Sequence, residues 1–313
     1  MSRCRLSLDH LELLQAVAQT GSLAQSANYL GLTQPALSYR LREAERRLGV
    51  ELFSKERGKR VTMTPAAQRL LPTAELVLDQ LTRAESDVER IARGFQYTVR
   101  LALPSRACFL WLPRFLDFLQ NNHSELDVVF ELQAGPAPLE SLARGKVDVA
   151  VLPAKPSAEH FESRLLFSDE VMVVLPAGHT LAEASFVAPG AFAECALITD
   201  ETPAEADVHA MAALQPLGIA PMRYIQAGSP ETTAELVGSG FGLGLASRRF
   251  GSRWQRDNVV SRSIGAKASK LAWHVAIRRS EADGTPTEHL FERLFYWFER
   301  KDAPRDPLRD VGS

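Results

Sequence analysis

The stretch TQPALSYRLREAERRLG, residues 33–49, decides the fold of the N-terminal part of the chain. Its apolar residues recur three and four positions apart, so they share one side of a helix. They are Ala36, Leu37, Leu41, Ala44 and Leu48. Thr33 and Gly49 are typical of the residues that begin and end a helix. The segment therefore predicts a short helix with one apolar side and a broad outer surface rich in arginine.

A second short helix is expected just before this one. The segment GSLAQSANYLGL, residues 21–32, predicts a helix from Leu23 to about Leu30 that Gly31 ends. Two short helices joined by a three- or four-residue turn containing glycine are typical of a helix-turn-helix. The second helix of that motif enters the DNA major groove, led by its N-terminal residues. The alternative is an ordinary helical hairpin whose arginines are solvated.

A basic hairpin is expected after the two helices. In ELFSKERGKRVTMT, residues 51–64, apolar residues lie on either side of the turn ERGK. Four basic residues would lie at its tip: Lys55, Arg57, Lys59 and Arg60. A basic hairpin beside a recognition helix is a wing, which can contact a phosphate strand or the minor groove.

The distribution of charge supports a DNA-binding N-terminal domain. Residues 1–64 contain ten Lys and Arg against six Asp and Glu, a net charge of +4. The rest of the chain contains 26 against 32, a net charge of -6. A basic block on an acidic body is expected when a single domain contacts phosphate.

Composition indicates a globular protein. The chain has 313 residues, 45% of them hydrophobic, and no apolar run approaches the ~20 residues that span a membrane. The start, MSRCRLSLDH, does not have the pattern of a signal peptide, so we expect a cytoplasmic protein without membrane contact. The cysteines, Cys4, Cys108 and Cys195, are too far apart to indicate a zinc site or a disulfide framework.

A long amphipathic helix is expected over residues 65–93, opened by Thr64-Pro65 and followed by Gly94. A helix of this length extends about 42 Å. Its apolar stripe is too long for a small winged domain to cover. We therefore interpret it as a linker and dimerisation helix. The alternative is that the stripe packs on its own chain.

Beyond Gly94 the pattern changes to alternating strands and helices. Strands are expected at 97–104, 126–132 and 147–153, with helices between them, which implies a parallel sheet. A strand at 171–176 would cross to a second lobe. That lobe would hold strands at 196–199 and 222–228 and a helix, glycine turn and strand over 231–247. A strand at 269–279 and a helix at 285–300 would return to the first lobe. Two such lobes bind small ligands in the cleft between them.

An enzyme is the first rival reading. The sequence contains no G-x-S-x-G elbow, P-loop or H-E-x-x-H motif. GFGLGLAS at 240–247 follows a helix and precedes a strand, the reverse of a dinucleotide-binding loop. The seven histidines show no metal-ligand spacing, so neither catalytic nor metal-binding residues are expected. A pure solute-binding protein would leave the basic N-terminal block unexplained.

Over its whole length the chain resembles a LysR-type transcriptional regulator. The match is specific over LDHLELLQAVAQTGSLAQSANYLGLTQPALSYRLREAERRLGVELFSKERGKRVTMTPAA, and looser over VDVAVLP and LVGSGFGLGLAS. The resemblance implies an N-terminal all-α winged helix-turn-helix with a long linker helix. A C-terminal α/β, two-lobed effector domain like a periplasmic binding protein would follow.

The resemblance also implies domain boundaries. Residues 1–64 would form the DNA-binding domain, 65–94 the linker and dimerisation helix, 95–300 the effector-binding domain and 301–313 a C-terminal tail. Lobe 1 would comprise about 95–170 and 270–300, and lobe 2 about 171–269.

The family roles carry over to ten residues expected to contact double-stranded promoter DNA. They are Thr33, Gln34, Pro35, Ser38, Tyr39, Arg40, Arg42, Lys55, Arg57 and Arg60. The chain departs from the family pattern at several positions, where Tyr39, Ala44, Lys55 and Ala67 replace the usual arginine, leucine, arginine and glycine. These departures bear on which DNA sequence is bound, and not on DNA binding itself.

The family cleft maps onto ten further residues, expected to bind a small-molecule effector. They are Ser105, Arg106, Ala107, Gly135, Pro136, Thr199, Asp200, Gly228, Ser229 and Thr232. Ser105 and Arg106 would begin a helix whose N-terminus favours a carboxylate, and Asp200 could bind an ammonium group. The alternative is that Ser105 only caps that helix and Arg106 is solvated.

The regions LPSRACFLWLPRFLDF and SDEVMVVLPAGHTLA are most similar to the MetR group, which regulates methionine biosynthesis and senses homocysteine. The resemblance implies a homodimer or homotetramer, a small-molecule effector, no other cofactor, and RNA polymerase as a further candidate partner. Two alternatives stay open: a LysR-type regulator of another pathway with a different effector, and a small-molecule-binding protein without a regulatory role.

Overall fold

The computed structural model describes residues 4–54, 61–104, 111–199, 208–249, 258–281 and 284–299. The chain divides into two compact units, residues 1–93 and 94–313. Each unit has a hydrophobic core of its own.

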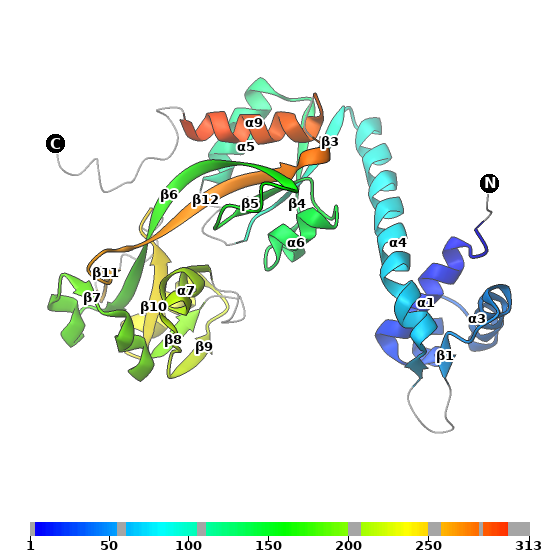
Figure 1. The fold of residues 1–313 in the computed structure, drawn as a ribbon, viewed down its shortest axis with the longest axis horizontal. Helices are drawn as coiled ribbons and strands as arrows, with labels where there is room; N and C mark the ends of the chain where they lie inside the picture. Colours follow the sequence, from blue (N-terminus) through cyan, green and yellow to red (C-terminus); the bar gives the residue numbers. More distant parts are fainter. Residues whose placement is uncertain are drawn as a thin grey trace. The chain divides into compact units, whose positions relative to one another are not determined.

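The N-terminal unit contains the expected helices and hairpin (Figure 1). In chain order its elements are α1 (Leu8–Thr20), α2 (Leu23–Tyr29), α3 (Gln34–Leu48), β1 (Phe53–Ser54), β2 (Thr62–Met63) and α4 (Pro65–Ala92). Strands β1 and β2 pair antiparallel, with Phe53 opposite Met63. The tip of the hairpin, residues 55–60, lies outside the described residues.

Local sequence explains where these helices begin and end. The side chains of Ser22 and Thr33 accept hydrogen bonds from backbone N–H groups in the first turns of α2 and α3. Gly21 and Gly49 end α1 and α3 with φ of 63° and 77°, in the left-handed conformation that glycine adopts without strain. The three helices bury one shared apolar core with the base of the hairpin.

Helix α4 has 28 residues and continues through Pro72 without a break. Near its start, Ala67 and Ala74 are fully buried in the core of the unit. Farther along, its large apolar side chains are exposed: Leu76, Val77, Leu81, Val88 and Ile91. The core of the N-terminal unit therefore covers only the beginning of the apolar stripe.

The C-terminal unit is α/β. Its strands are β3 (Tyr97–Ala102), β4 (Leu126–Phe130), β5 (Val149–Leu152), β6 (Phe161–Pro176), β7 (Phe186–Val187), β8 (Ala196–Thr199), β9 (Arg223–Gln226), β10 (Leu243–Ser247), β11 (Val259–Ile264) and β12 (Ser269–Arg278). Its helices are α5 (Leu112–Asn122), α6 (Pro138–Ala143), α7 (Val208–Ala213), α8 (Pro230–Gly238) and α9 (Pro286–Glu299), with short 3-10 turns between elements.

Ten strands of the described residues form one sheet, in which the order β4-β3-β5-β12-β6-β10-β8-β9 is continuous. Strand β3 pairs parallel with β4 and β5, and β8 pairs parallel with β9 and β10, which gives two parallel groups. Antiparallel strands β6 and β12 connect the groups (Figure 1, green and orange). The two-lobed architecture that the sequence predicts is confirmed.

Strand β6 is longer than the sequence predicts. We expected a strand from Val171, but β6 begins at Phe161, because polar residues in its first half interrupt the apolar pattern. Leu166 has no opposite residue in β12, so it forms a β-bulge between the Leu165–His274 and Phe167–Trp273 pairs. The extra residue places both Leu166 and Phe167 in the core.

Candidate nucleic-acid interface and effector site

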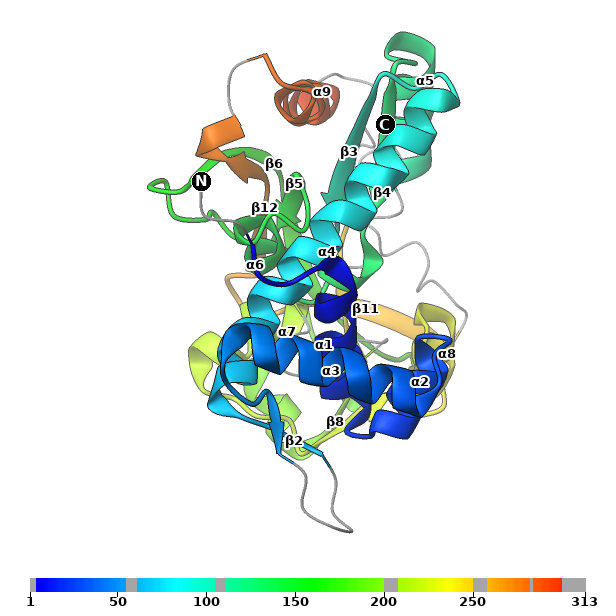
Figure 2. The ribbon, with the colours of Figure 1, turned by 90° about the vertical axis from the view of Figure 1, so that its right-hand side faces the viewer.

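Helix α3 presents four different sides to its surroundings. Its apolar side is fully buried within the unit, with Leu37 at 0% and Leu41 at 2% exposure. Figure 2 shows α3 lying alongside α1 and α2, whose apolar side chains belong to the same core. Since the apolar side is already satisfied, the three polar sides determine what α3 can bind.

One polar side of α3 holds the base of the wing. A carboxylate oxygen of Glu45 accepts hydrogen bonds from the backbone N–H groups of Leu52, at 2.8 Å, and Phe53, at 3.4 Å. Just before the second strand of the hairpin, the N–H of Val61 donates to the carbonyl of Gly21 at 3.1 Å. The base of the wing is therefore attached to α3 and to the end of α1.

The opposite polar side of α3 faces α1 and the segment before it. Arg40 forms an ion pair with Asp9 of α1 at 3.3 Å. Arg47 donates to the backbone carbonyl of Arg5 at 3.1 Å. These contacts direct Arg40 and Arg47 toward the protein.

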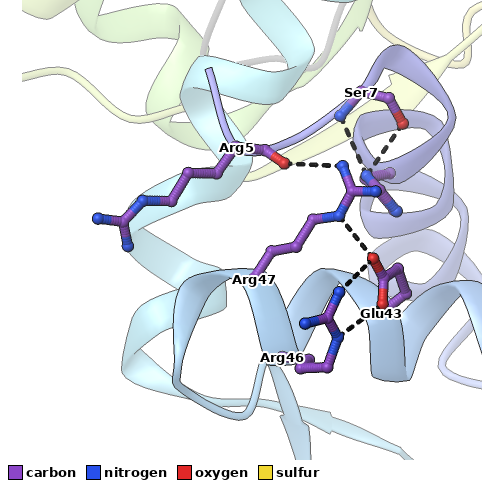
Figure 3. A network of polar contacts seen from close by, with 6 residues as sticks. Arg5, Ser7, Glu43, Arg46 and Arg47 are labelled. Carbon is purple, nitrogen blue, oxygen red and sulfur yellow. Dashed lines mark hydrogen bonds and ion pairs between the residues drawn. The ribbon is translucent and has the colours of Figure 1, made fainter. Parts of the chain in front are cut away.

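The carboxylate of Glu43 binds the last two arginines of α3, Arg46 and Arg47 (Figure 3). Glu43 accepts two hydrogen bonds from Arg46, both at 2.8 Å, and one from the Nε of Arg47 at 2.7 Å. Hydrogen bonds from the two guanidinium groups lower the pKa of Glu43 to about 2. The carboxylate is therefore ionised at any physiological pH.

The outward side of α3 carries the exposed residues of the recognition surface. Gln34, Pro35 and Tyr39 are exposed, Tyr39 at 66%. Arg42 is also exposed, and its Nε donates to the backbone carbonyl of Ser38 at 3.2 Å. An exposed amide, a phenol ring and a guanidinium group are suited to base edges and phosphates.

The structure places the other predicted DNA contacts as follows. Thr33 is exposed at the start of α3, where its hydroxyl caps the helix by accepting from the N–H of Ala36 at 3.4 Å. Lys55, Arg57 and Arg60 lie outside the described residues.

A histidine caps α1 next to this surface. The backbone N–H of Ser7 donates to Nδ1 of His10 at 3.0 Å, so this nitrogen carries no proton. His10 is 7% exposed, and burial lowers its pKa below the usual 6.5, as does the positive charge of Arg47. The Asp9 and Glu43 carboxylates act in the opposite direction, and Arg40 acts in the same direction as Arg47. Neutral His10 fills the role that glutamate or glutamine usually has in a capping box.

In lobe 1, Gly135 and Pro136 follow β4 and the short turn Leu132–Ala134. A Cβ atom on Gly135 would lie 2.9 Å from the carbonyl oxygen of Leu103, just after β3. Glycine is therefore required for the close approach of this loop to the end of β3. Ser105, Arg106 and Ala107 lie outside the described residues.

In lobe 2, four predicted effector residues gather at the carboxyl ends of β8 and β9. Thr199 ends β8, and its carbonyl accepts from the N–H of Ala227 at 2.8 Å. Gly228 has φ of 81°, and Ser229 then caps α8 by accepting from the N–H of Thr232 at 3.1 Å. Asp200 lies outside the described residues. The structure thus brings Thr199, Gly228, Ser229 and Thr232 to one edge of the sheet, where α/β lobes bind ligands.

Comparison with known families covers both units. The family described as "LysR substrate binding domain" matches residues 92–298. The family described as "Bacterial regulatory helix-turn-helix protein, lysR family" matches residues 8–68. The chain belongs to the LysR family.

The LysR chain has named relatives and structural neighbours. It is 31% identical to the regulator MetR of Salmonella typhimurium over 222 residues, which are 69% of this chain and 67% of that protein. Full-length CbnR in complex with its target DNA has a TM-score of 0.68 at 16% identity, over 94% of this chain and 100% of CbnR. The regulatory domain of MetR from N. meningitidis has a TM-score of 0.59 at 20% identity, over 66% of this chain and 96% of that one. These two structural likenesses show the fold alone.

Family membership decides between the rival classes. The protein is a LysR-type DNA-binding transcriptional regulator with an effector-binding domain, and its family consists of regulators and not of enzymes. In the part of the chain that the structure describes, no helix is long and apolar enough to cross a membrane. Within the same residues, no three His, Cys, Asp or Glu side chains are placed to hold a metal ion.

Three acidic residues beside the recognition surface of this LysR regulator were not predicted from its sequence. Glu43 could have been found, because it precedes Arg46 and Arg47 by three and four positions, the spacing of helical ion pairs. Asp9 and Glu45 could not, because their partners Arg40 and Leu52 are far along the chain or are backbone groups.

Proposed function

We propose that this LysR regulator controls genes of methionine biosynthesis in response to homocysteine. The observation that carries the proposal is its 31% identity to MetR of Salmonella typhimurium over 222 residues. The effector would lie between the lobes, with its carboxylate bound by Ser105 and Arg106 and its ammonium group bound by Asp200.

On the DNA side, we assign base contacts to Gln34, Pro35, Ser38 and Tyr39. The assigned phosphate or minor-groove contacts are Thr33, Arg42, Lys55, Arg57 and Arg60. The exposure of Gln34, Pro35, Tyr39 and Arg42 on the outer side of α3 supports these four contacts, and Ser38 is half-buried beside them. Arg40 is also assigned to the DNA-binding surface. It lies at the edge of that surface, because its ion pair with Asp9 directs it toward α1.

We further propose that the protein assembles through α4 into a homodimer or homotetramer. The exposed apolar side chains of α4, Val88 at 66% and Ile91 at 61% among them, need a partner helix to leave water. Promoter DNA, a small-molecule effector and a second copy are thus the assigned partners, with RNA polymerase as a further candidate. A regulator that binds chromosomal DNA acts in the cytoplasm.

Calorimetric titration of the full chain with homocysteine tests the proposal, with methionine, cysteine and homoserine as matched amino acids. We expect saturable binding of homocysteine and no comparable binding of the other three. If no amino acid binds to the folded chain, the methionine assignment is wrong. The protein is then a LysR regulator of another pathway with a different effector.

A further inference from the structure

We propose that Glu43 is a specificity residue of the DNA-binding surface, which holds Arg46 and Arg47 away from the phosphates of non-cognate duplexes. The proposal rests on the assignment of α3 as the helix that enters the groove. It goes beyond that assignment because it gives an acidic side chain a role in choosing DNA.

The geometry shows that both arginines are bound by one carboxylate. Arg46 contacts Glu43 through its Nε and one terminal nitrogen, the paired arrangement that makes arginine–carboxylate contacts strong. Arg47 adds its Nε to the same oxygen that the terminal nitrogen of Arg46 contacts, and its Nη1 is bound to the Arg5 carbonyl. The side chain of Glu43 is 21% exposed, and both arginines are bound to it.

The charges of α3 are therefore divided along the helix. Arg40 is paired with Asp9, and Arg46 and Arg47 share Glu43. Among the described residues, Arg42 is the α3 arginine without an acidic partner, and it lies beside Ser38 and Tyr39. Positive charge that is available to DNA is concentrated where the base contacts are assigned.

This division lowers non-specific binding more than specific binding. Binding to non-cognate DNA depends almost entirely on neutralised phosphates, whereas cognate binding adds base contacts. A phosphate that approaches Arg46 or Arg47 must compete with Glu43 and is repelled by it. Discrimination is a difference between two affinities, so a residue that weakens only the wrong complex increases it.

The test compares the wild-type chain with Glu43→Gln on two duplexes, one of mixed sequence and one selected by the wild-type chain from a random pool. Binding is measured by fluorescence anisotropy over a series of salt concentrations. For Glu43→Gln on the mixed duplex, we expect the slope of log K against log salt to become more negative by about 1 to 2. This is the change expected for one or two additional phosphate contacts. The affinity at low salt should rise about tenfold, and the preference for the selected duplex should fall.

Three control variants separate this effect from a change in net charge or in folding. Glu12→Gln removes the same charge from an exposed position of α1, and should leave the salt slope nearly unchanged. Glu43→Asp keeps the charge and should retain the wild-type slope. In an Arg46→Ala background, Glu43→Gln should steepen the slope by about half as much as in the wild type, because Arg47 alone is released.

Two contrary results are distinguishable. In the first, the wild type discriminates between the duplexes, and Glu43→Gln shows the same salt slope and the same preference as the wild type. Glu43 then has no role in specificity: this proposal is overturned, and the assignment of α3 to DNA still stands. If the wild type selects no duplex from the pool and does not bind the mixed duplex, the assignment of α3 to DNA fails, and this proposal fails with it.

Discussion

Helices α3 and α4 belong to the same unit and both have an apolar stripe, but the stripes end in different environments. In α3 the stripe is covered by its own chain, with Leu37 fully buried and Ala44 at 1% exposure. In α4 the stripe is covered only near its start, and Val88 and Ile91 are more than half exposed. The same periodicity therefore supports folding in one helix and leaves an uncovered apolar surface in the other. We assign the outer polar side of α3 to DNA and the exposed apolar side of α4 to a second copy of the chain.

The largest expected effect is on the stripe of α3. Leu37→Ala should destabilise the DNA-binding unit by about 3 kcal/mol, because it leaves a cavity in a fully buried core. Thermal unfolding should show this loss at every protein concentration. Leu81→Ala is the matched control in α4, where the side chain is 36% exposed. If the two variants lose equal, concentration-independent stability, the contrast between the helices is wrong.

The next effect is on the stripe of α4. Leu81→Arg should weaken association by about 100-fold, because a charge would be buried in the seam between two copies. Sedimentation velocity should then show monomers at concentrations where the wild type is assembled. Ser86→Arg places the same side chain about 140° away around the helix and should remain assembled. A Leu81→Arg chain that still assembles would exclude α4 as the dimer seam.

A smaller effect is expected on the outer side of α3. Ser38→Ala should weaken binding to the selected duplex by about tenfold, the value of one lost hydrogen bond to a base edge. Binding to the mixed duplex should hardly change. Its slope of log K against log salt should stay at the wild-type value, about -5 if about six phosphates are neutralised. Equal losses on both duplexes would remove Ser38 from the base contacts.

The smallest effect is a pH dependence confined to the α1–α3 side of the unit. The pKa of His10 lies below 6.5 in the folded chain, so as pH falls through 6.5 the unfolded chain takes up the proton first. The stability supplied by the neutral histidine is complete above pH 6.5 and is lost below it, up to about 1 kcal/mol for one helix cap.

Thermal unfolding between pH 7.5 and 5.5 measures this loss, and His10→Gln is the control. Glutamine can cap α1 without titrating, so the variant should lose less stability over the same interval. Helix α4 contains no histidine, so titration of histidine should not dissociate the proposed α4 dimer over this range. An identical pH dependence in wild type and variant would contradict the role of His10.

Much of the DNA-binding unit could be predicted because its signals are local. Thr33, Gly49 and Thr64 mark helix ends by their own chemistry, and the structure has caps at all three. The spacing of the leucines in α3 identified its buried side. The α/β order of the second unit was likewise readable from alternating apolar runs.

The first half of β6 could not be predicted, because distant residues stabilise its polar side chains. Arg164 forms an ion pair with Glu292 of α9 and lies over the ring of Phe295. Asp169, 7% exposed, accepts from the hydroxyl of Ser247 and the backbone N–H of Arg249. These partners come from other elements, so the local pattern contains no trace of them. The same reason hides the Arg40–Asp9 pair of the candidate site.

The bond between Glu45 and the first strand of the wing has a consequence for how DNA is chosen. Because one carboxylate holds the backbone of Leu52 and Phe53, the base of the wing cannot shift along α3 without breaking that contact. The separation between a groove contact and a flanking contact is then set by the protein. A duplex must match that separation through its own groove width and bending, which depend on sequence. Base pairs that no side chain reaches would therefore contribute to the choice of promoter.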